Sequence, residues 1–172
     1  MNATITLLPG DGIGPEVTEQ AVKVLKAVAK QRRLNLEFRQ ALIGGVAIDR
    51  TGDPLPPATL EAIAESDAVL MGAVGDPKYD DPSLPVRPEQ GLLALRQHMG
   101  VYANLRPLRV LPALLHGSAI KPEVLQGADL LVVRELTGGI YFGQPRGRET
   151  RNGERWAVDT MTYSESEVRR VA

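Results

Sequence analysis

The chain alternates short β-rich runs with segments of helical periodicity, and this alternation constrains its fold more than any other feature. Thr4–Leu8 is a β-rich run, the turn residues P-G-D-G-I-G-P-E follow at Pro9–Glu16, and helical spacing takes over at Pro15. Ala58–Ala64 has the spacing of a short helix, and Ala68–Val74 is apolar throughout, as a strand covered on both faces must be. Strands separated by helices predict an α/β fold with a parallel sheet.

The remaining periodicity predicts further elements on both sides of a loop. The helix after Pro15 is amphipathic, with one apolar face formed by Val17, Ala21, Val24, Leu25 and Val28. Ile43–Pro57 is too rich in glycine and proline for a regular element and is predicted to be a loop. The other predicted elements are strands at Leu34–Phe38 and Val101–Val110, a helix at Gly91–Met99, a second buried strand at Asp129–Leu136, a β arm at Ala157–Tyr163 and a helix starting at Ser164.

Composition and charge exclude several classes of partner. The 172 residues are 43% hydrophobic and 24% charged, with a net charge of -1, as in a globular protein without a strong charge bias. Lysine and arginine are spread along the chain, so we expect no nucleic-acid binding. Cysteine is absent, which excludes disulfides and thiolate chemistry. Because we find neither a signal-peptide pattern nor a run approaching the roughly 18 apolar residues of a membrane span, we expect a cytoplasmic protein without a membrane partner.

Gly10–Gly14 reads G-D-G-I-G between a strand and a helix, where amide groups cradle the pyrophosphate in dinucleotide-binding folds. The G-x-G-x-x-G fingerprint is not met, because the third glycine comes one position early and Pro15 follows it. A tight turn is therefore the better interpretation of this segment taken alone.

Three arginines stand where an anionic substrate could bind, although each on its own is equally consistent with a solvated surface charge. Arg96 shares a predicted helix face with Leu92, so a carboxylate and an apolar group could be held side by side. Arg106 lies in a strand-like segment, and Arg134 ends a predicted buried strand, where open α/β sheets bind ligands. Strand alternation sends Arg134 and Glu135 to opposite faces, so each needs its own partner, and a small polyacid would satisfy Arg134.

Tyr141 follows two glycines in T-G-G-I-Y, where a phenol can stand free of a helix and donate a proton to an enolate. A core tyrosine bonded to a carbonyl is the alternative. His98 and His116 have no partner at a metal-ligand spacing and are interpreted as ordinary residues. Turn chemistry is favoured over cation binding for three aspartates near prolines, namely Asp76, Asp80 and Asp81.

Four motifs run in order along the chain: L-P-G-D-G-I-G-P-E, R-P-E-Q-G-L-L-A-L-R, A-N-L-R-P and V-R-E-L-T-G-G-I-Y-F-G. Together they resemble the isocitrate/isopropylmalate dehydrogenase family of β-decarboxylating dehydrogenases, and its isopropylmalate members most closely. The resemblance covers roughly the N-terminal half of such an enzyme. It implies a non-Rossmann α/β fold with a parallel or mixed sheet flanked by helices, incomplete in this chain. Residues 1–103 would belong to the first, cofactor-side domain, and residues 104–172 would begin the second domain, which binds substrate, dimerises and carries the β arm.

The resemblance also implies roles for individual residues. Arg96, Arg106 and Arg134 would hold the malate carboxylates through bidentate pairing. Leu92 and Leu93 would contact the isopropyl group. Tyr141 would be the catalytic residue that protonates the carbanion after CO2 leaves. The implied reaction is the oxidative decarboxylation of 3-isopropylmalate to 4-methyl-2-oxopentanoate with reduction of NAD, a step of leucine biosynthesis.

The same resemblance implies an NAD site and a divalent metal. The cofactor contacts would be Ile13, Asp76, Pro77, Lys78 and Glu89, with Glu89 near the nicotinamide ring and close to the substrate. Asp76 stands where the family commonly has glycine. Mg²⁺ or Mn²⁺ would polarise the forming carbonyl. We expect its ligands and a catalytic lysine beyond Ala172, with the lysine and one aspartate crossing a homodimer interface, so the 172-residue chain alone is predicted to be inactive.

Two alternatives stay open from the sequence. Enzymes acting on tartrate, D-malate or homoisocitrate share most of these motifs, and the Leu92-Leu93 pair is the feature that argues against them. The predicted helix at Ser164–Ala172 has no stop signal, which leads us to expect a truncated sequence. The chain could therefore be a non-catalytic fragment or subunit that pairs with another polypeptide through the arm at Ala157–Tyr163.

Overall fold

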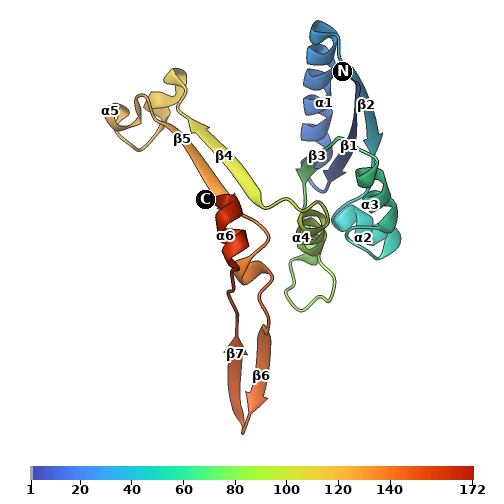
Figure 1. Ribbon diagram of the computed structural model, residues 1–172, viewed down its shortest axis with the longest axis vertical. Coiled ribbons are helices and arrows are strands. Elements are labelled where there is room, and N and C mark those ends of the chain that lie inside the picture. Colours follow the sequence, from blue (N-terminus) through green and yellow to red (C-terminus); the bar gives the residue numbers. More distant parts are fainter. Residues whose placement is uncertain (1) are drawn as a thin grey trace. The chain divides into compact units, whose positions relative to one another are not determined.

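The computed structural model describes residues 2–172, which form two compact units. The first unit runs to Met99, and the second extends from Gly100 to Ala172. Figure 1 shows the course of the chain through both units.

The first unit contains a three-stranded parallel sheet, as the alternation of strands and helices predicts. Its strands are β1 (Asn2–Gly10), β2 (Asn35–Gln40) and β3 (Ala68–Ala73), in the order β2-β1-β3. The central strand pairs with both neighbours, so that Ile5 lies opposite Phe38 in β2 and Ala68 in β3. Strand β3 is thus at an edge and only partly buried, which corrects the prediction of a strand covered on both faces.

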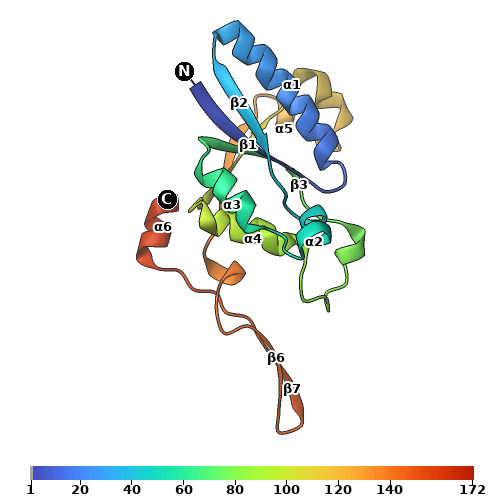
Figure 2. The same ribbon diagram turned by 90° about the vertical axis from the view of Figure 1, so that its right-hand side faces the viewer.

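Helix α1 (Gly14–Arg32) connects β1 to β2 and packs against the sheet (Figures 1 and 2). It begins with proline at N1 or N2 and Glu16 in its first turn, as the sequence indicates. The predicted apolar face is wrong in part, because Val17, Val24 and Val28 are exposed. The buried residues are small ones, namely Gly14, Thr18 and Ala29. Small side chains let the helix approach the sheet, since a Cβ on Gly14 would lie 2.0 Å from the Pro9 carbonyl oxygen.

The segment predicted to be a loop, Ile43–Pro57, contains the helix α2 (Gly45–Thr51), which corrects that prediction. Its glycines mark the helix ends: Gly44 at the start and Gly52 at the end both have positive φ angles, of 83° and 79°. Helix α3 (Pro57–Ala64) follows and matches the predicted short helix. Both helices lie beyond the carboxyl ends of the strands (Figure 1).

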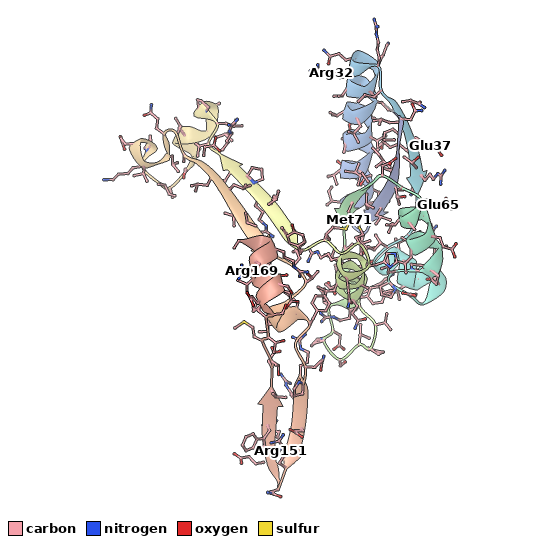
Figure 3. The ribbon with its side chains drawn as sticks, viewed as in Figure 1. Arg32, Glu37, Glu65, Met71, Arg151 and Arg169 are labelled. Atoms are coloured by element: carbon pink, nitrogen blue, oxygen red, sulfur yellow. The ribbon has the colours of Figure 1, made fainter. Side chains whose placement is uncertain are left out.

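The core of the first unit joins the sheet to these helices and to α4 (Pro88–His98). It consists of Leu8, Ile43, Leu55, Ile63 and Leu95. Of the buried threonines, Thr59 donates its Oγ1 to the Leu42 carbonyl at 2.7 Å, whereas the hydroxyl of Thr18 in α1 is buried without a hydrogen-bond partner among residues 2–172. At the outer edge of the sheet, Arg39 pairs with Glu37 in β2 at 2.9 Å and with Glu65 after α3 at 2.8 Å; both acids are labelled in Figure 3.

The second unit is built from two antiparallel ribbons. Strand β4 (Ala103–Arg109) pairs with β5 (Asp129–Glu135), and β6 (Gly147–Arg151) pairs with β7 (Glu154–Val158). The prediction of a buried strand at Asp129–Leu136 is wrong, because β5 is exposed along most of its length and has an antiparallel partner. Short helices complete the unit: η2 (Pro112–Gly117), α5 (Pro122–Leu125), η3 (Gly139–Tyr141) and α6 (Glu165–Val171).

The prediction of a β arm at Ala157–Tyr163 is correct only for Ala157 and Val158, which end β7 of the β6–β7 hairpin; residues 159–163 form no strand. The turn between the two strands is made by Asn152 and Gly153, whose φ angles are 50° and 79°. Arg151, the residue before this turn, is labelled in Figure 3. Helix α6 starts with a capping box in which Ser164 Oγ accepts from the Glu167 amide at 3.2 Å. Among residues 2–172, no helix has the length and apolar character needed to cross a membrane.

Candidate active site

The predicted site residues fall into two groups, one in each unit. The first unit holds the proposed cofactor contacts and one side of the proposed substrate site: Ile13, Asp76, Pro77, Lys78, Glu89, Leu92, Leu93 and Arg96. The second unit holds Arg106, Arg134 and Tyr141.

Asp11 organises the region that carries the predicted cofactor contacts, a role that the sequence reasoning missed. It follows β1 and is 6% exposed. Its Oδ2 accepts from the amides of Gly45 at 2.8 Å and Gly75 at 3.0 Å, and its Oδ1 accepts from the Val46 amide at 2.8 Å. One carboxylate therefore links the turn after β1, the start of α2 and the residues that follow β3. The available signal was an acidic residue next to glycine directly after a strand, which equally describes a turn.

The segment after Gly75 carries the predicted cofactor contacts Asp76, Pro77 and Lys78, the last two in η1 (Pro77–Tyr79). Asp76 Oδ1 accepts from the Lys78 amide at 3.0 Å, a turn interaction of the kind favoured from the sequence. Asp81 behaves similarly, accepting from the Ser83 amide at 2.8 Å. Ile13, in the turn before α1, has 58% of its surface exposed and is thus accessible to a ligand.

Asp49 on α2 holds the other end of this segment. It pairs with the Lys78 ammonium and accepts from the Tyr79 hydroxyl at 2.8 Å. Hydrogen bonds from Lys78 and Tyr79 lower the pKa of Asp49, whereas the hydrogen bond to Asp49 raises the pKa of Lys78. For Tyr79, desolvation and then the hydrogen bond to Asp49 raise the pKa. The lysine predicted to touch the cofactor is therefore held in place by acidic neighbours.

Helix α4 carries Glu89, Leu92, Leu93 and Arg96, which are spaced at i, i+3, i+4 and i+7 and form one stripe. Leu92, Leu93 and Arg96 are half-buried, whereas Leu95, on the neighbouring stripe, lies in the core. A Cβ on Gly75 would stand 3.9 Å from Glu89 Oε1, so the chain at Gly75 passes the start of this helix. The stripe therefore presents an acidic group, then two apolar groups, then a basic group.

In the second unit, the register of β4 and β5 places Arg106 and Arg134 on one face of the ribbon. Asn104 lies opposite Arg134, and Arg106, two residues further along β4, has the same orientation. Arg106 Nε donates to Asn104 Oδ1 at 2.8 Å. Asn104 was part of a recognised motif, but the sequence reasoning assigned it no role. The face therefore presents two guanidinium groups with an amide between them.

Tyr141 lies at the end of η3, next to Arg134. Arg134 Nη2 donates to the Tyr141 hydroxyl, and its guanidinium carbon is 5.6 Å from the ring centroid. Tyr141 is 36% exposed, so the phenol is accessible to a ligand rather than buried. The guanidinium and the phenol therefore form one polar pair at this end of the ribbon.

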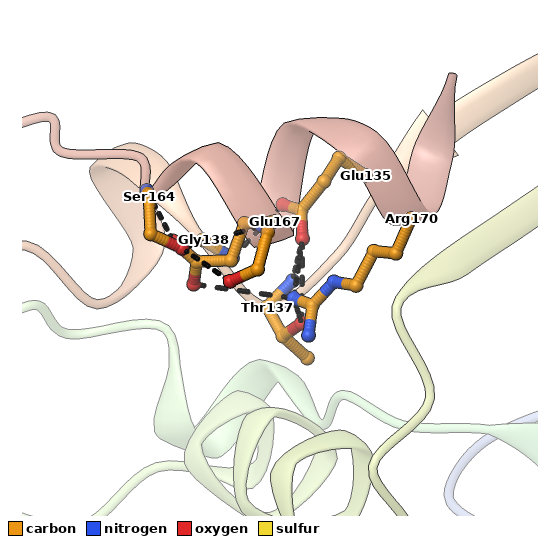
Figure 4. Close-up of polar contacts among 7 residues, drawn as sticks. Glu135, Thr137, Gly138, Ser164, Glu167 and Arg170 are labelled. Atoms are coloured by element: carbon orange, nitrogen blue, oxygen red, sulfur yellow. Dashed lines mark hydrogen bonds and ion pairs between the residues drawn. The ribbon is translucent and has the colours of Figure 1, made fainter.

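Glu135, the last residue of β5, holds the turn that leads to Tyr141 (Figure 4). Its carboxylate accepts from the amides of Thr137 at 3.0 Å and Gly138 at 2.9 Å and pairs with Arg170 of α6 at 3.3 Å. Burial acts to raise the pKa of Glu135, but the hydrogen bonds from Gly138, Thr137 and Arg170 outweigh it and lower the pKa. Glu135 and Arg134 therefore have separate partners, as strand alternation predicts.

The glycines before Tyr141 allow the chain to pass beneath a second tyrosine. A Cβ on Gly139, whose φ is +64°, would lie 2.2 Å from the Tyr163 hydroxyl, and one on Gly138 would lie 2.9 Å from the Tyr163 ring. Tyr163 ends the segment predicted as a β arm, and the sequence offers no signal of this contact. The pair of glycines thus reflects close packing as well as turn formation.

The described side chains do not form a metal centre. Within residues 2–172, no three histidine, cysteine, aspartate or glutamate side chains are grouped so that they could hold an ion.

Comparisons with known proteins relate the whole chain to one family. The family model described as isocitrate/isopropylmalate dehydrogenase matches residues 4–172. A 3-isopropylmalate dehydrogenase of Anaeromyxobacter dehalogenans is 58% identical over 99% of the chain and 48% of that relative, and one of Thiobacillus denitrificans is 59% identical over 98% and 47%. The chain thus spans about half the length of the curated relatives it matches.

Solved structures agree with this relation. The crystal structure of a β-decarboxylating dehydrogenase from Thermococcus kodakarensis is 33% identical, with a TM-score of 0.65 over 98% of this chain and 43% of that one. Isocitrate dehydrogenase from Methylococcus capsulatus is 28% identical, with a TM-score of 0.77 over 98% and 45%. With its parallel sheet, its four motifs and a match over nearly its full length, the chain belongs to the isocitrate/isopropylmalate dehydrogenase family.

Proposed function

We propose that this chain supplies the substrate-binding and proton-donating side chains of an NAD-dependent 3-isopropylmalate dehydrogenase. The observation that carries the proposal is the cluster of Arg106, Asn104, Arg134 and Tyr141 on one side of the second unit. The relatives named 3-isopropylmalate dehydrogenase, at 58% and 59% identity, support the choice of reaction.

In this proposal, Arg106 and Arg134 bind the carboxylates of the malate. A guanidinium has five N–H donors, so Arg134 can hold Tyr141 with one nitrogen and direct its other N–H groups to a carboxylate. Arg96 would be the third carboxylate ligand. Leu92 and Leu93, one turn away from it on the same stripe of α4, would face the isopropyl group and disfavour a polar substituent.

The reaction then consists of an oxidation, a decarboxylation and a protonation. The hydroxyl-bearing carbon of the substrate would lose a hydride while its hydroxyl would pass a proton to a base other than the side chains described here, which would leave a 2-oxo acid. Ile13, Asp76, Pro77, Lys78 and Glu89 would hold NAD, which would supply the hydride acceptor. The bond to the β-carboxylate breaks, CO2 leaves, and the electron pair remains as an enolate. Tyr141 donates its proton to the carbanionic carbon, and Arg134 stabilises the phenolate that forms.

Several properties of the complete enzyme are part of the same proposal. We place residues 1–103 in its cofactor-side domain and 104–172 in its substrate and dimerisation domain. The enzyme would be a cytoplasmic homodimer that uses Mg²⁺ or Mn²⁺, held by side chains other than those described here.

The test is a substrate panel on the purified protein as its gene encodes it. Isopropylmalate, malate, isocitrate and tartrate are compared by NADH absorbance with NAD and Mg²⁺ present. We expect the highest kcat/KM with isopropylmalate and no steady turnover from a chain of residues 1–172 alone. Absence of NADH with every acid, or a higher kcat/KM with isocitrate than with isopropylmalate, would refute the proposal.

A further inference from the structure

Asp11 connects the segment proposed to bind the cofactor to the rest of the first unit. Its carboxylate accepts from three backbone amides in two separate segments, those of Gly45, Val46 and Gly75. We propose that Asp11 is a positioning residue for the cofactor, which it serves by fixing the backbone at Gly75 and thereby the segment Gly75–Tyr79. This inference rests on the proposed function, because the role of that segment in binding NAD is itself proposed.

The packing around Asp11 leaves little room for a side chain at Gly44 or Gly45. A Cβ on Gly44 would lie 2.3 Å from Asp11 Oδ2, so the carboxylate reaches the α2 amides only over a glycine. A Cβ on Gly45 would lie 3.1 Å from the Asp76 Cβ and 3.2 Å from the Tyr79 ring. The start of α2 therefore abuts the cofactor-side segment, and the carboxylate lies between the two.

The electrostatics explain how a carboxylate can be buried here. Burial of a charged group is costly unless hydrogen bonds satisfy it. Asp11 is 6% exposed, and the three amide dipoles point at its oxygens from 2.8 to 3.0 Å. Two of the amides belong to the first turn of α2, where N–H groups lack partners within the helix. Because all these contacts are with protein amides, Asp11 acts on a ligand only through the backbone that it holds.

Helix α2 holds the far end of the same segment through Asp49, one turn after Gly45 and on the same face. Asp49 binds the Lys78 ammonium and the Tyr79 hydroxyl. The side chains of the Asp49–Lys78 pair are 46% and 45% exposed, so water and salt weaken this contact. Asp11 is therefore the stronger of the two attachments, and the two variants should differ in the size of their effects.

The experiment compares Asp11→Asn with Asp49→Asn and with Asp53→Asn as a matched control. Asparagine preserves the size of the side chain but presents one accepting oxygen and an NH2 group that cannot accept from an amide. Asp53 is an aspartate of the same unit whose Oδ1 accepts from the Leu55 amide at 2.8 Å, outside the cofactor-side segment. The variants are made in the protein as its gene encodes it.

Two readouts separate positioning from general stability. Amide hydrogen exchange at Gly75–Tyr79 should be about 10- to 100-fold faster in Asp11→Asn, a few-fold faster in Asp49→Asn and unchanged in Asp53→Asn, as loss of hydrogen bonds to a charged acceptor predicts. Exchange in β1 and β3 should stay unchanged. In parallel, the KM for NAD should rise about tenfold in Asp11→Asn, while the KM for the dicarboxylate stays within about twofold.

A uniform rise in exchange throughout the first unit, or no change at Gly75–Tyr79, would overturn the inference. If Asp11→Asn does not fold, Asp49→Asn decides, because its surface position spares the core; unchanged exchange at Lys78 and Tyr79 would then count against the inference. If the unmodified protein makes no NADH, the proposed function fails, while the exchange measurement still decides whether Asp11 fixes the segment.

Discussion

Removal of the Glu135 side chain should destabilise the second unit, because this carboxylate holds the turn before Tyr141. In Glu135→Ala, the amides of Thr137 and Gly138 lose acceptors at 3.0 and 2.9 Å, and Arg170 loses an ion pair at 3.3 Å. Glu135 is 14% exposed and Arg170 35% exposed, so water replaces part of each interaction. At about 1 kcal/mol for each amide and about 0.5 kcal/mol for the ion pair, we expect a loss of about 2–3 kcal/mol in the free energy of unfolding.

Urea unfolding monitored by tryptophan fluorescence measures this loss. The chain has one tryptophan, Trp156, and it lies in β7 of the same unit. With a urea dependence of about 1–3 kcal/mol per M, the midpoint should fall by about 1 M or more. Glu135→Gln, which keeps an accepting oxygen but loses the charge, should fall between the wild type and Glu135→Ala. Glu123→Ala, on the exposed helix α5, serves as the control.

The same interaction predicts a dependence on pH. The pKa of Glu135 is below its ordinary value of 4.5 in the folded chain, so the folded state favours the charged carboxylate. The stabilisation is therefore fully present above the unfolded pKa and is lost as the pH falls through the lower, folded pKa. The difference between wild type and Glu135→Gln should shrink over this acidic range. A Glu135→Ala midpoint equal to that of Glu123→Ala would refute the reasoning.

Three further predictions concern the proposed active site and its support. Tyr141→Phe should lower kcat by about 10²- to 10⁴-fold with little change in the KM of the dicarboxylate, measured by NADH and CO2 release, and an unchanged kcat would rule out the proton-donor role. Arg106→Lys should raise the KM of the dicarboxylate about tenfold, because lysine lacks the planar fork, whereas the KM of NAD should stay constant. Gly139→Ala should destabilise the second unit by about 2 kcal/mol through its positive φ and its overlap with the Tyr163 hydroxyl. The double variant with Tyr163→Phe should recover part of that loss in urea unfolding, and equal midpoints for the single and double variants would count against the overlap.

The elements that sequence reasoning located correctly are those whose signals are local. The strand, glycine turn and proline-led helix at the start of the chain follow one another within β1 and α1, and α3 likewise begins at a proline. The start of α6 likewise has a local signal, because its capping box joins Ser164 to Glu167, three residues later. The β6–β7 turn at Asn152-Gly153 also had a local signal, which the sequence interpretation overlooked.

The candidate site shows the same difference between local signals and contacts that form between distant segments. Motifs in family order indicated Arg106, Arg134 and Tyr141, and the alternation of a strand was enough to separate Arg134 from Glu135. Their actual neighbours, Asn104 across the ribbon and Tyr163 over the glycines, depend on register and on packing between segments distant in the sequence. Spacing along the chain carries no information about such contacts.

Helix α2 shows most directly what the sequence by itself determined and what it left to the tertiary structure. Its glycine- and proline-rich surroundings predicted a loop, whereas Gly44 and Gly52 lie at the two ends of a helix. The helix between them depends on Asp11, 34 residues earlier than Gly45, whose carboxylate accepts from the first amides of the helix. In the same way, β5 was recognisable as a strand from its apolar run, but its antiparallel partner and its exposure were set by the sheet it joins. Backbone preferences act between residues that are neighbours in the chain. Helix caps from residues distant in the sequence, strand partners and burial exist only once distant segments have come together.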